Sequence, residues 1–173
     1  MVEIKRIGPA DARRALATIN RLLPQLSPSG KAVPLTIEEL NECLGNQNFY
    51  LFVARETSGG GEQLLLGMGS IFFQRNLGRW IAEIHDIVVD KDHRGQGIGE
   101  IIVRHLIENA RGFAREHRLP VKLYYDHLFL GLTSRPSRVE ANKLYLKLGF
   151  VQVAEAKGEW GTNLYKMMIR PEE

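Results

Sequence analysis

IHDIVVDKDHRGQGIG, residues 84–99, is the stretch that decides the fold of this chain. It runs from an apolar strand pattern into a glycine-rich loop, and residues 98–117 then repeat apolar side chains at helical spacing. The first N–H groups of a helix lack intrahelical partners, and the helix dipole adds partial positive charge there. Glycines let the backbone approach an anion closely. The stretch therefore predicts a phosphate-binding turn at residues 94–99, between a strand and a helix.

Two other kinds of phosphate loop do not fit these residues. A Walker loop ends in Gly-Lys followed by Ser or Thr, and residues 94–99 contain no lysine. A dinucleotide-binding glycine loop normally follows the first strand of a βαβ unit, whereas this loop follows the fourth predicted strand. A loop in which the glycines only turn the chain remains an alternative at this point.

The pattern of apolar and turn-forming residues predicts strands and helices on either side of this stretch. Strands are predicted at residues 2–7, 49–55, 63–73, 79–89, 121–125, 150–153 and 164–169, and helices at residues 9–23, 36–45, 98–117 and 137–148. Thr36 is the expected N-cap of the second helix, and Ser137 with Glu140 forms an expected capping box for the fourth. The order β-α-α-β-β-β-α-β-α-β-β predicts an α/β (α+β) fold. Its central sheet is mixed and mostly antiparallel, with helices on both faces.

Length and composition limit the classes of protein to which the chain can belong. Its 173 residues fit one domain, 1–173, and no linker or repeat interrupts them. The net charge of +3 is not gathered in a basic run, so we expect no nucleic-acid partner. Cys43 is the sole cysteine and no apolar segment approaches a bilayer-spanning length, so we expect a cytoplasmic protein without membrane contact. The five histidines lack metal-ligand spacing, and we expect no metal.

Two motifs resemble a known family. RGQGIG at residues 94–99 resembles the acetyl-CoA signature of the GNAT superfamily, Arg/Gln-x-x-Gly-x-Gly/Ala. LTSRPSR at residues 132–138, with Asn142, Tyr145 and Gly-Phe at 149–150, resembles the fourth-helix region of bacterial members. The resemblance implies the GNAT fold, with residues 1–173 as a single N-acetyltransferase domain.

The resemblance also implies how acetyl-CoA is bound. Backbone amides of Gln96, Gly97 and Gly99 would hold the pyrophosphate, and Ile87 and Val89 would pair through their backbones with the pantetheine arm. A backbone N–H near Ile87 or Val88 would donate to the oxyanion. The implied cofactor-binding residues are Ile87, Val88, Val89, Arg94, Gly95, Gln96, Gly97, Ile98, Gly99 and Asn142.

Transfer to an amine requires a neutral nucleophile. A lysine-like amine has a pKa of about 10.4, so holding it neutral at pH 7 costs roughly 4.6 kcal/mol. Glu83 is the first candidate general base, because its position before the loop resembles that of the base in histone acetyltransferases. His85 lies on the same strand face as Glu83 and has a suitable unperturbed pKa. Asp86 is expected on the opposite face unless the strand bulges, and a water chain without a single base is the remaining alternative.

Tyr145 is the candidate group at the leaving sulfur. It lies three residues after Asn142, so the two share a helix face. The matching tyrosine of the family protonates or hydrogen-bonds the departing thiolate, and the matching asparagine contacts the CoA arm. From helical spacing alone, Tyr145 would be read as a core aromatic residue.

The resulting hypothesis is an N-acetyltransferase that moves the acetyl group of acetyl-CoA to a primary amine by direct attack in a ternary complex. The alternative is a catalytically inactive CoA-binding or sensor module with the same fold. The acceptor is a small-molecule or peptide amine, and the resemblance leaves a homodimer open. Residues 124–131 lengthen the connection before the fourth helix beyond the family pattern, so the register of the fifth strand is not determined from sequence.

Overall fold

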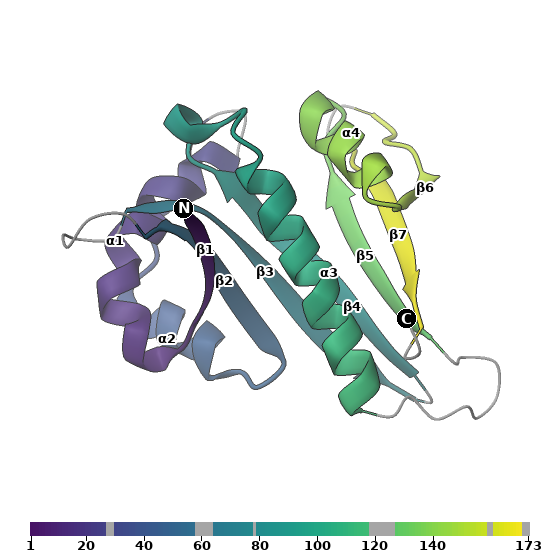
Figure 1. Cartoon of the computed structure of the whole chain (residues 1–173), viewed down its shortest axis with the longest axis horizontal. Coiled ribbons are helices and arrows are strands. Elements are labelled where there is room, and N and C mark those ends of the chain that lie inside the picture. The colour runs from purple at the N-terminus through teal and green to yellow at the C-terminus, as the bar shows by residue number, and fades with distance from the viewer. Residues whose placement is uncertain (27–29, 58–63, 78, 118–126, 159–160, 171–173) are drawn as a thin grey trace. The chain divides into compact units, whose positions relative to one another are not determined.

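A computed structural model describes residues 1–26, 30–57, 64–77, 79–117, 127–158 and 161–170. Its α-helices are α1 (Ala12–Leu22), α2 (Ile37–Gly45), α3 (Ile98–Glu116) and α4 (Val139–Lys147). Its strands are β1 (Val2–Ile7), β2 (Phe49–Glu56), β3 (Leu65–Asn76), β4 (Arg79–Val89), β5 (Leu128–Ser134), β6 (Val151–Ala154) and β7 (Asn163–Ile169). The strands form one sheet in the order β1-β2-β3-β4-β5-β7-β6 (Figure 1).

The predicted fold class is confirmed. The sheet is mixed, because β4 and β5 are parallel while the pairs β1–β2, β5–β7 and β6–β7 are antiparallel. The observed order departs from the expected one by short 3₁₀ helices, which lie at Pro9–Asp11, Leu23–Leu26 and Lys91–His93 in the described part of the chain. Proline at position 9 suits the first turn of such a helix, since its missing N–H has no intrahelical partner to lose.

The chain forms two compact units, and the first comprises Met1–Ile71 with Asp86–His105. In this unit, α1 and α2 place Ile19, Leu22 and Leu40 in a buried cluster with Val53 of β2. The neighbouring residue in β2, Phe52, points to the opposite sheet face, where its ring lies 4.7 Å from that of His105 in α3. Helices therefore cover both faces of the sheet within this unit.

The start of α2 confirms the predicted N-cap. The Thr36 hydroxyl accepts a hydrogen bond from the Glu39 N–H at 3.2 Å, and the Glu39 carboxylate accepts one from the Thr36 N–H at 2.8 Å. This reciprocal pair satisfies two amides at the beginning of the helix. The helix ends at Gly45, close to the predicted end.

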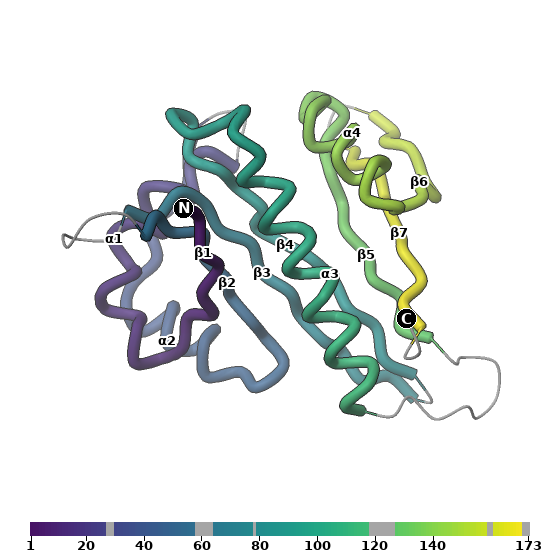
Figure 2. The backbone as a smooth tube through the Cα atoms, in the orientation of Figure 1, coloured from purple at the N-terminus to yellow at the C-terminus, as the bar shows by residue number. Residues whose placement is uncertain are grey.

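The second unit comprises Phe72–His85 with Leu106–Glu173, and a buried face of its sheet supports α4. Ala82, Leu130 and Tyr165 are buried on three adjacent strands, and the Tyr165 ring lies 5.7 Å from that of Tyr145 in α4. Figure 2 shows β5 and β7 running side by side. Since side chains alternate along a strand, the residues between these buried positions face the other side.

The fifth strand and the start of the fourth helix differ from the sequence-based expectation. The strand predicted at residues 121–125 lies outside the described residues, and β5 occupies Leu128–Ser134, where buried and less buried residues alternate. The predicted capping box of Ser137 and Glu140 is wrong: the N-cap of α4 is Arg138, which makes no side-chain capping hydrogen bond.

Asn142 secures the turn before α4 instead. Its side-chain amide donates to the Arg135 carbonyl at 3.0 Å and to the Pro136 carbonyl at 3.4 Å. The turn is therefore closed from inside the helix rather than by a cap at its start.

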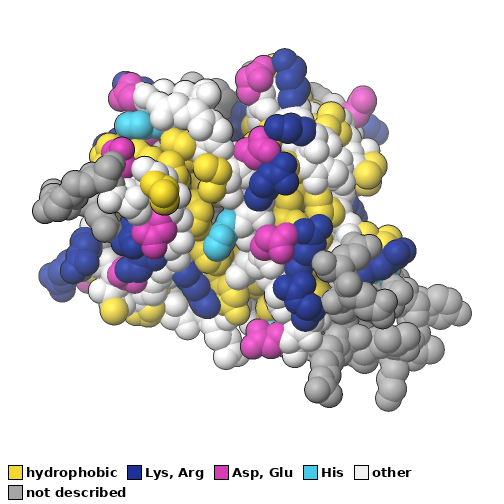
Figure 3. All heavy atoms as spheres, viewed as in Figure 1, with side chains coloured by type: hydrophobic (Ala, Val, Ile, Leu, Met, Phe, Trp, Pro, Cys, Tyr) yellow, Lys and Arg dark blue, Asp and Glu magenta, His cyan; other side chains and the backbone are white. Residues whose placement is uncertain are grey.

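Charged side chains of both signs are interspersed on the face seen in Figure 3. On α3, for example, Arg104 pairs with Glu100 at 2.7 Å, and Arg111 pairs with Glu108. None of the helices in the described part of the chain has the length and apolar character needed to cross a membrane.

Candidate active site

The glycine loop after β4 has the geometry expected of an anion-binding turn. Gly95 and Gly97 have φ angles of 77° and 78°, in the left-handed region that favours glycine. The loop is exposed up to Gly97, whereas Ile98 is only 2% exposed and anchors the first turn of α3 in the core. Ile101 donates to the Gly97 carbonyl at 3.1 Å, so the amides that precede Ile101 lie in the turn without intrahelical acceptors.

Side chains from the N-terminal part of the chain hold the loop in position. Gln25 accepts hydrogen bonds at one oxygen from the Lys91 N–H at 2.8 Å and from the Arg94 guanidinium at 3.4 Å. Arg94 also donates to the Val89 carbonyl at 3.1 Å. Arg94 is thus fixed beside the loop, with its other N–H groups available to an anion.

A buried carboxylate anchors the same turn. Asp90 is 1% exposed, accepts from the Asp92 N–H at 3.2 Å and forms an ion pair with Arg21 of α1. Sequence analysis missed Gln25, Arg21 and Asp90 as supports of the loop. No local pattern links Arg21 of α1, or Gln25 just after it, to a turn that follows β4, so only the folded chain reveals these contacts.

The last residues of β4 differ from those before them. Ile87 and Val88 are buried and Val89 is partly buried, so their side chains present little surface to a ligand. Asp86 has a φ angle of 53° and follows the exposed His85, so two consecutive residues are exposed and the alternation reverses. Ser70 donates to the Asp86 carboxylate at 2.8 Å. The strand irregularity that would place the Asp86 side chain on the other sheet face is therefore present.

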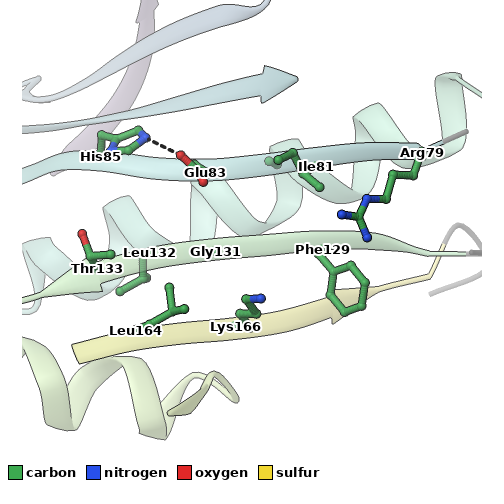
Figure 4. Close-up of a pocket in the computed structure, with 11 residues that line it drawn as sticks. Arg79, Ile81, Glu83, His85, Phe129, Gly131, Leu132, Thr133, Leu164 and Lys166 are labelled. Atoms are coloured by element: carbon green, nitrogen blue, oxygen red, sulfur yellow. Dashed lines mark ion pairs between the residues drawn. The ribbon is translucent and has the colours of Figure 1, made fainter. Parts of the chain in front are cut away.

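Glu83 and His85 line a pocket of about 440 Å³ in the second unit (Figure 4). Their side chains are about half exposed, and the His85 Nε2 lies 3.3 Å from a Glu83 carboxylate oxygen. The structure thus brings together the two candidate bases, as expected for alternate residues of one strand. A pair of this kind can pass a proton from a bound amine toward solvent.

Three adjacent strands build this pocket at one level. Glu83 of β4 pairs with Gly131 of β5, and Gly131 pairs with Lys166 of β7. Gly131 has no side chain, so the space between Glu83 and Lys166 is left open. A Cβ at this glycine would meet only the Ala82 and Tyr165 carbonyl oxygens, both at 3.9 Å.

Cationic and aromatic residues extend from Lys166, which lies level with Glu83, to the end of the pocket away from His85. Lys166 Nζ lies 5.9 Å from the centroid of the Phe129 ring, and Arg79 also lines this end (Figure 4). Thr133 lines the pocket from β5. Sequence analysis did not select any of these four residues, because strand patterns do not reveal which strands become neighbours.

Tyr145 is enclosed by aromatic rings. It is 1% exposed, and its ring lies 6.1 Å from that of Phe150 and 5.7 Å from that of Tyr165. Burial raises the pKa of Tyr145 above its ordinary value, Tyr165 adds to the increase, and Arg138 opposes it. The phenol therefore keeps its proton at neutral pH and can act as a hydrogen-bond donor.

Asn142 and Tyr145 both belong to α4 in the second unit, with Glu83 and His85. The Asn142 side-chain oxygen is buried and has no hydrogen-bond partner among the described residues. A buried acceptor of this kind requires a donor, which a ligand amide would supply. Residues from Ile87 to Gly99 belong to the first unit.

The described residues include no group of three or more His, Cys, Asp or Glu side chains arranged to hold a metal ion.

Comparison with known proteins identifies the family. The family model for the acetyltransferase (GNAT) domain matches residues 47–152, which is more than half of the chain. The chain belongs to the GNAT acetyltransferase family. This GNAT acetyltransferase is an acyltransferase, and acetyl-CoA is its acetyl donor, as in the family.

Two curated rice proteins (Oryza sativa subsp. japonica) are similar to the GNAT acetyltransferase in sequence. Glucosamine 6-phosphate N-acetyltransferase 1 is 38% identical over 122 residues, covering 64% of this chain and 68% of the relative. Probable glucosamine 6-phosphate N-acetyltransferase 2 is 30% identical over 118 residues, covering 64% of this chain and 67% of the relative.

Solved structures share the fold along nearly the whole chain. A GNAT-family acetyltransferase from Streptococcus pneumoniae has a TM-score of 0.73 and 23% identity, covering 98% of this chain and 99% of its own. The putative acetyltransferase yncA from Salmonella typhimurium, solved with its cofactor acetyl-CoA, has a TM-score of 0.68 and 19% identity, covering 100% and 95%. At these identities the likeness supports the fold alone.

Proposed function

We propose that this GNAT acetyltransferase transfers the acetyl group of acetyl-CoA to a primary amine by direct attack in a ternary complex. We further propose that the acceptor is a small molecule that carries an anionic group besides its amine. The observation that carries this proposal is the pocket in which Glu83 and His85 stand opposite Lys166, with Gly131 between them.

The cofactor lies on backbone groups in this proposal. Amides of Gln96, Gly97 and Gly99 hold the pyrophosphate, and the positive φ angle of Gly97 supports a turn that exposes them. Ile87 and Val89 pair through their backbones with the pantetheine arm. An N–H near Ile87 or Val88 stabilises the oxyanion, and such donors contribute a few kcal/mol when they are preorganised.

The remaining contacts on the cofactor come from side chains. Arg94 adds a positive charge beside the phosphates, and its hydrogen bond to the Val89 carbonyl supports that position. The unpartnered oxygen of Asn142 accepts an N–H of the CoA arm, which satisfies a buried acceptor.

The reaction needs two proton movements. The ammonium form of the acceptor loses a proton to the Glu83–His85 pair, and the neutral nitrogen then attacks the thioester carbonyl carbon. A carbon–nitrogen bond forms and the carbon–sulfur bond breaks, so CoA leaves as a thiolate. Tyr145 donates a hydrogen bond to that sulfur and so stabilises the thiolate, since its raised pKa keeps the phenol neutral. The amide nitrogen loses its remaining positive charge as a second proton passes to solvent or to the basic pair.

The spacing of charges supports an acceptor with an anionic group. Glu83 and Lys166 are separated by two strand spacings, about 10 Å between backbones. An amine at the Glu83 end and an anion at the Lys166 end would therefore be bridged by a compact body over Gly131. The name of the rice relative, glucosamine 6-phosphate N-acetyltransferase 1, describes an acceptor with this combination of groups.

A turnover screen tests the proposal. Acetyl-CoA consumption is measured with glucosamine 6-phosphate, glucosamine, a lysine peptide and a polyamine. We expect the phosphorylated amine to give the highest kcat/KM, and no turnover of any amine would contradict the proposed transfer. Equal kcat/KM values for glucosamine 6-phosphate and glucosamine would contradict only the anionic group.

Two variants locate the acceptor within the pocket. Lys166→Gln should raise KM for glucosamine 6-phosphate about tenfold and leave glucosamine unchanged, because one charge-assisted contact is lost. Lys157→Gln, an exposed lysine outside the pocket lining, is the matched control. Gly131→Val should block the acceptor without unfolding the protein, since its Cβ has ordinary contact distances. Unchanged KM values in both pocket variants would contradict this position for the acceptor.

A further inference from the structure

A second cavity, of about 700 Å³, lies entirely in the first unit. It shares no lining residue with the Glu83 pocket. Its lining comes mainly from two strands and one helix, and includes Lys5 and Ile7 of β1, Val53 and Arg55 of β2, and Arg14 and Arg21 of α1. The volume is within the range of small-molecule sites, which is roughly 300–1,000 Å³.

The floor of this cavity is apolar. Ile7 and Val53 are 6% and 1% exposed, and Ala15 of α1 is 4% exposed. Leu65 adds a partly buried apolar side chain from β3. The uncharged part of a ligand could therefore pack against this surface without burying unpaired polar groups.

The rim of the cavity is cationic, and carboxylates restrain three of its four cations. Lys5 pairs with Asp11 at 2.7 Å, Arg55 pairs with Glu3 at 2.7 Å, and Arg21 pairs with Asp90. Asp11 lines the cavity beside Lys5, whereas Glu3 and Asp90 are outside its lining. Carboxylates outside the cavity lining therefore hold the Arg55 and Arg21 side chains in place. These side chains lose less conformational entropy when they contact a ligand.

Arg14 contributes a cation of a different kind. It is exposed, and it makes no hydrogen bond or salt bridge with a residue of the described chain. The pKa of Asp11 is lowered mainly by its hydrogen bond from Lys5, and the charge of Arg14 adds a small further lowering. A guanidinium offers five N–H donors in a planar fork that matches a carboxylate or a phosphate. Arg21 uses donors on Asp90 and on the Leu65 carbonyl, so further N–H groups are left for a ligand.

We infer that this cavity binds a small ligand with an oxyanion, a carboxylate or a phosphate, on a compact apolar body. The oxyanion lies against Arg14 with Arg21 and Arg55 nearby, and the apolar body covers Ile7 and Val53. The site is separate from that of the transferred acetyl group, and its occupation does not depend on the proposed acceptor.

Ligand titration followed by ¹⁵N–¹H NMR spectroscopy tests this inference on the full chain with CoA bound. The probes are phenyl phosphate and benzoate, which present the two oxyanions on the same ring, and benzyl alcohol as the neutral analogue. We expect saturable shifts of the Ala15, Thr18 and Val53 amides with at least one anionic probe. The larger response of the two identifies the preferred oxyanion, and benzyl alcohol should produce weaker shifts.

A pair of adjacent variants supplies the control. Arg14→Gln should weaken binding of the preferred probe about tenfold, as expected for the loss of one charge-assisted contact. Arg13→Gln removes the same charge from the same helix, but Arg13 is exposed outside the cavity lining, so the affinity should change less than about twofold. Both variants should keep the wild-type melting temperature and the wild-type acetyl-transfer rate.

Three results would overturn the inference: equal responses to benzyl alcohol and to the anions, equal losses of affinity in the two arginine variants, and shifts confined to the amides of residues 94–99. These results leave the amine turnover screen unaffected. Failure of the cavity and failure of the proposed transfer reaction are therefore distinguishable.

Discussion

The two halves of β4 differ in which groups they expose. From Ala82 to His85 buried and exposed residues alternate, and the strand presents Glu83 and His85 to the pocket while burying Ala82 and Ile84. From Ile87 to Val89 the side chains are buried or partly buried, and in the proposed function this half contributes backbone groups only. The irregularity at Asp86 separates the two halves.

This difference explains why the ligand contacts of the buried half and its glycine loop are easier to predict from sequence than those of the exposed half. A ligand that binds backbone groups requires a particular backbone conformation. Glycines at fixed positions in the loop after β4 indicate that conformation directly. Side-chain recognition requires partners from other strands, and a glutamate or a histidine on an exposed strand face has many structural uses. The following predictions alter the glycine loop that follows the buried half, the exposed half, the tyrosine of α4 and the irregularity at Asp86, one at a time.

The largest effect is expected from Gly97→Val, which removes the backbone turn. A β-branched residue at a φ angle of 78° is strained, and its side chain stands where an anion would approach the amides. Affinity for CoA, measured by calorimetry, should fall at least about 100-fold. Gly112→Ala in the middle of α3 is the control, because a Cβ there meets nothing within 4 Å. Retained affinity in a folded Gly97→Val protein would contradict the loop assignment.

The next largest effect tests the side-chain half of the strand. Glu83→Gln should lower kcat about 100-fold for an acceptor with a lysine-like amine, because the ammonium ion loses its base. The loss should be smaller for an acceptor whose amine has a pKa near 8, since less deprotonation is needed. Affinity for CoA should be unchanged, in contrast to Gly97→Val. If His85→Gln produces the larger loss in the same assay, His85 rather than Glu83 is the base.

Tyr145→Phe sharpens the contrast between binding and chemistry. The variant keeps the ring that packs on Tyr165 and should remain folded, while kcat falls about tenfold and CoA affinity is nearly unchanged. Because burial raises the pKa of Tyr145, the ratio of wild-type to variant rates should stay constant up to about pH 10. A ratio near one throughout the pH profile would remove Tyr145 from the mechanism.

The smallest catalytic effect is expected at the irregularity between the halves. Asp86→Asn should change kcat/KM less than about threefold, because asparagine also tolerates positive φ and can accept the Ser70 hydrogen bond. Asp86→Val should lower the free energy of unfolding by about 1–3 kcal/mol, measured by urea denaturation. Equal stability of the two variants would show that the backbone at residue 86 carries no strain.

Much of the fold was predictable because its signals are local. The bounds of β4 and the N-cap of α2 agree with the sequence-based prediction, and α3 begins at the predicted Ile98. Each depends on residues within a few positions of one another. The predicted capping box at α4 was wrong, although Ser137 and Glu140 have the right spacing. Asn142, a residue that the capping-box pattern does not include, closes the turn before α4 instead.

The sequence by itself determined the family, the glycine turn and the pairing of Glu83 with His85 on one strand face, because chain-local geometry specifies each of them. The assignment of these residues to catalysis stays a prediction. Only the tertiary structure decided that Gly131 and Lys166 lie level with Glu83, and that Arg21 holds the carboxylate of Asp90. Contacts of this kind join distant segments, and they are selected by strand register and by burial of the whole core rather than by any local pattern.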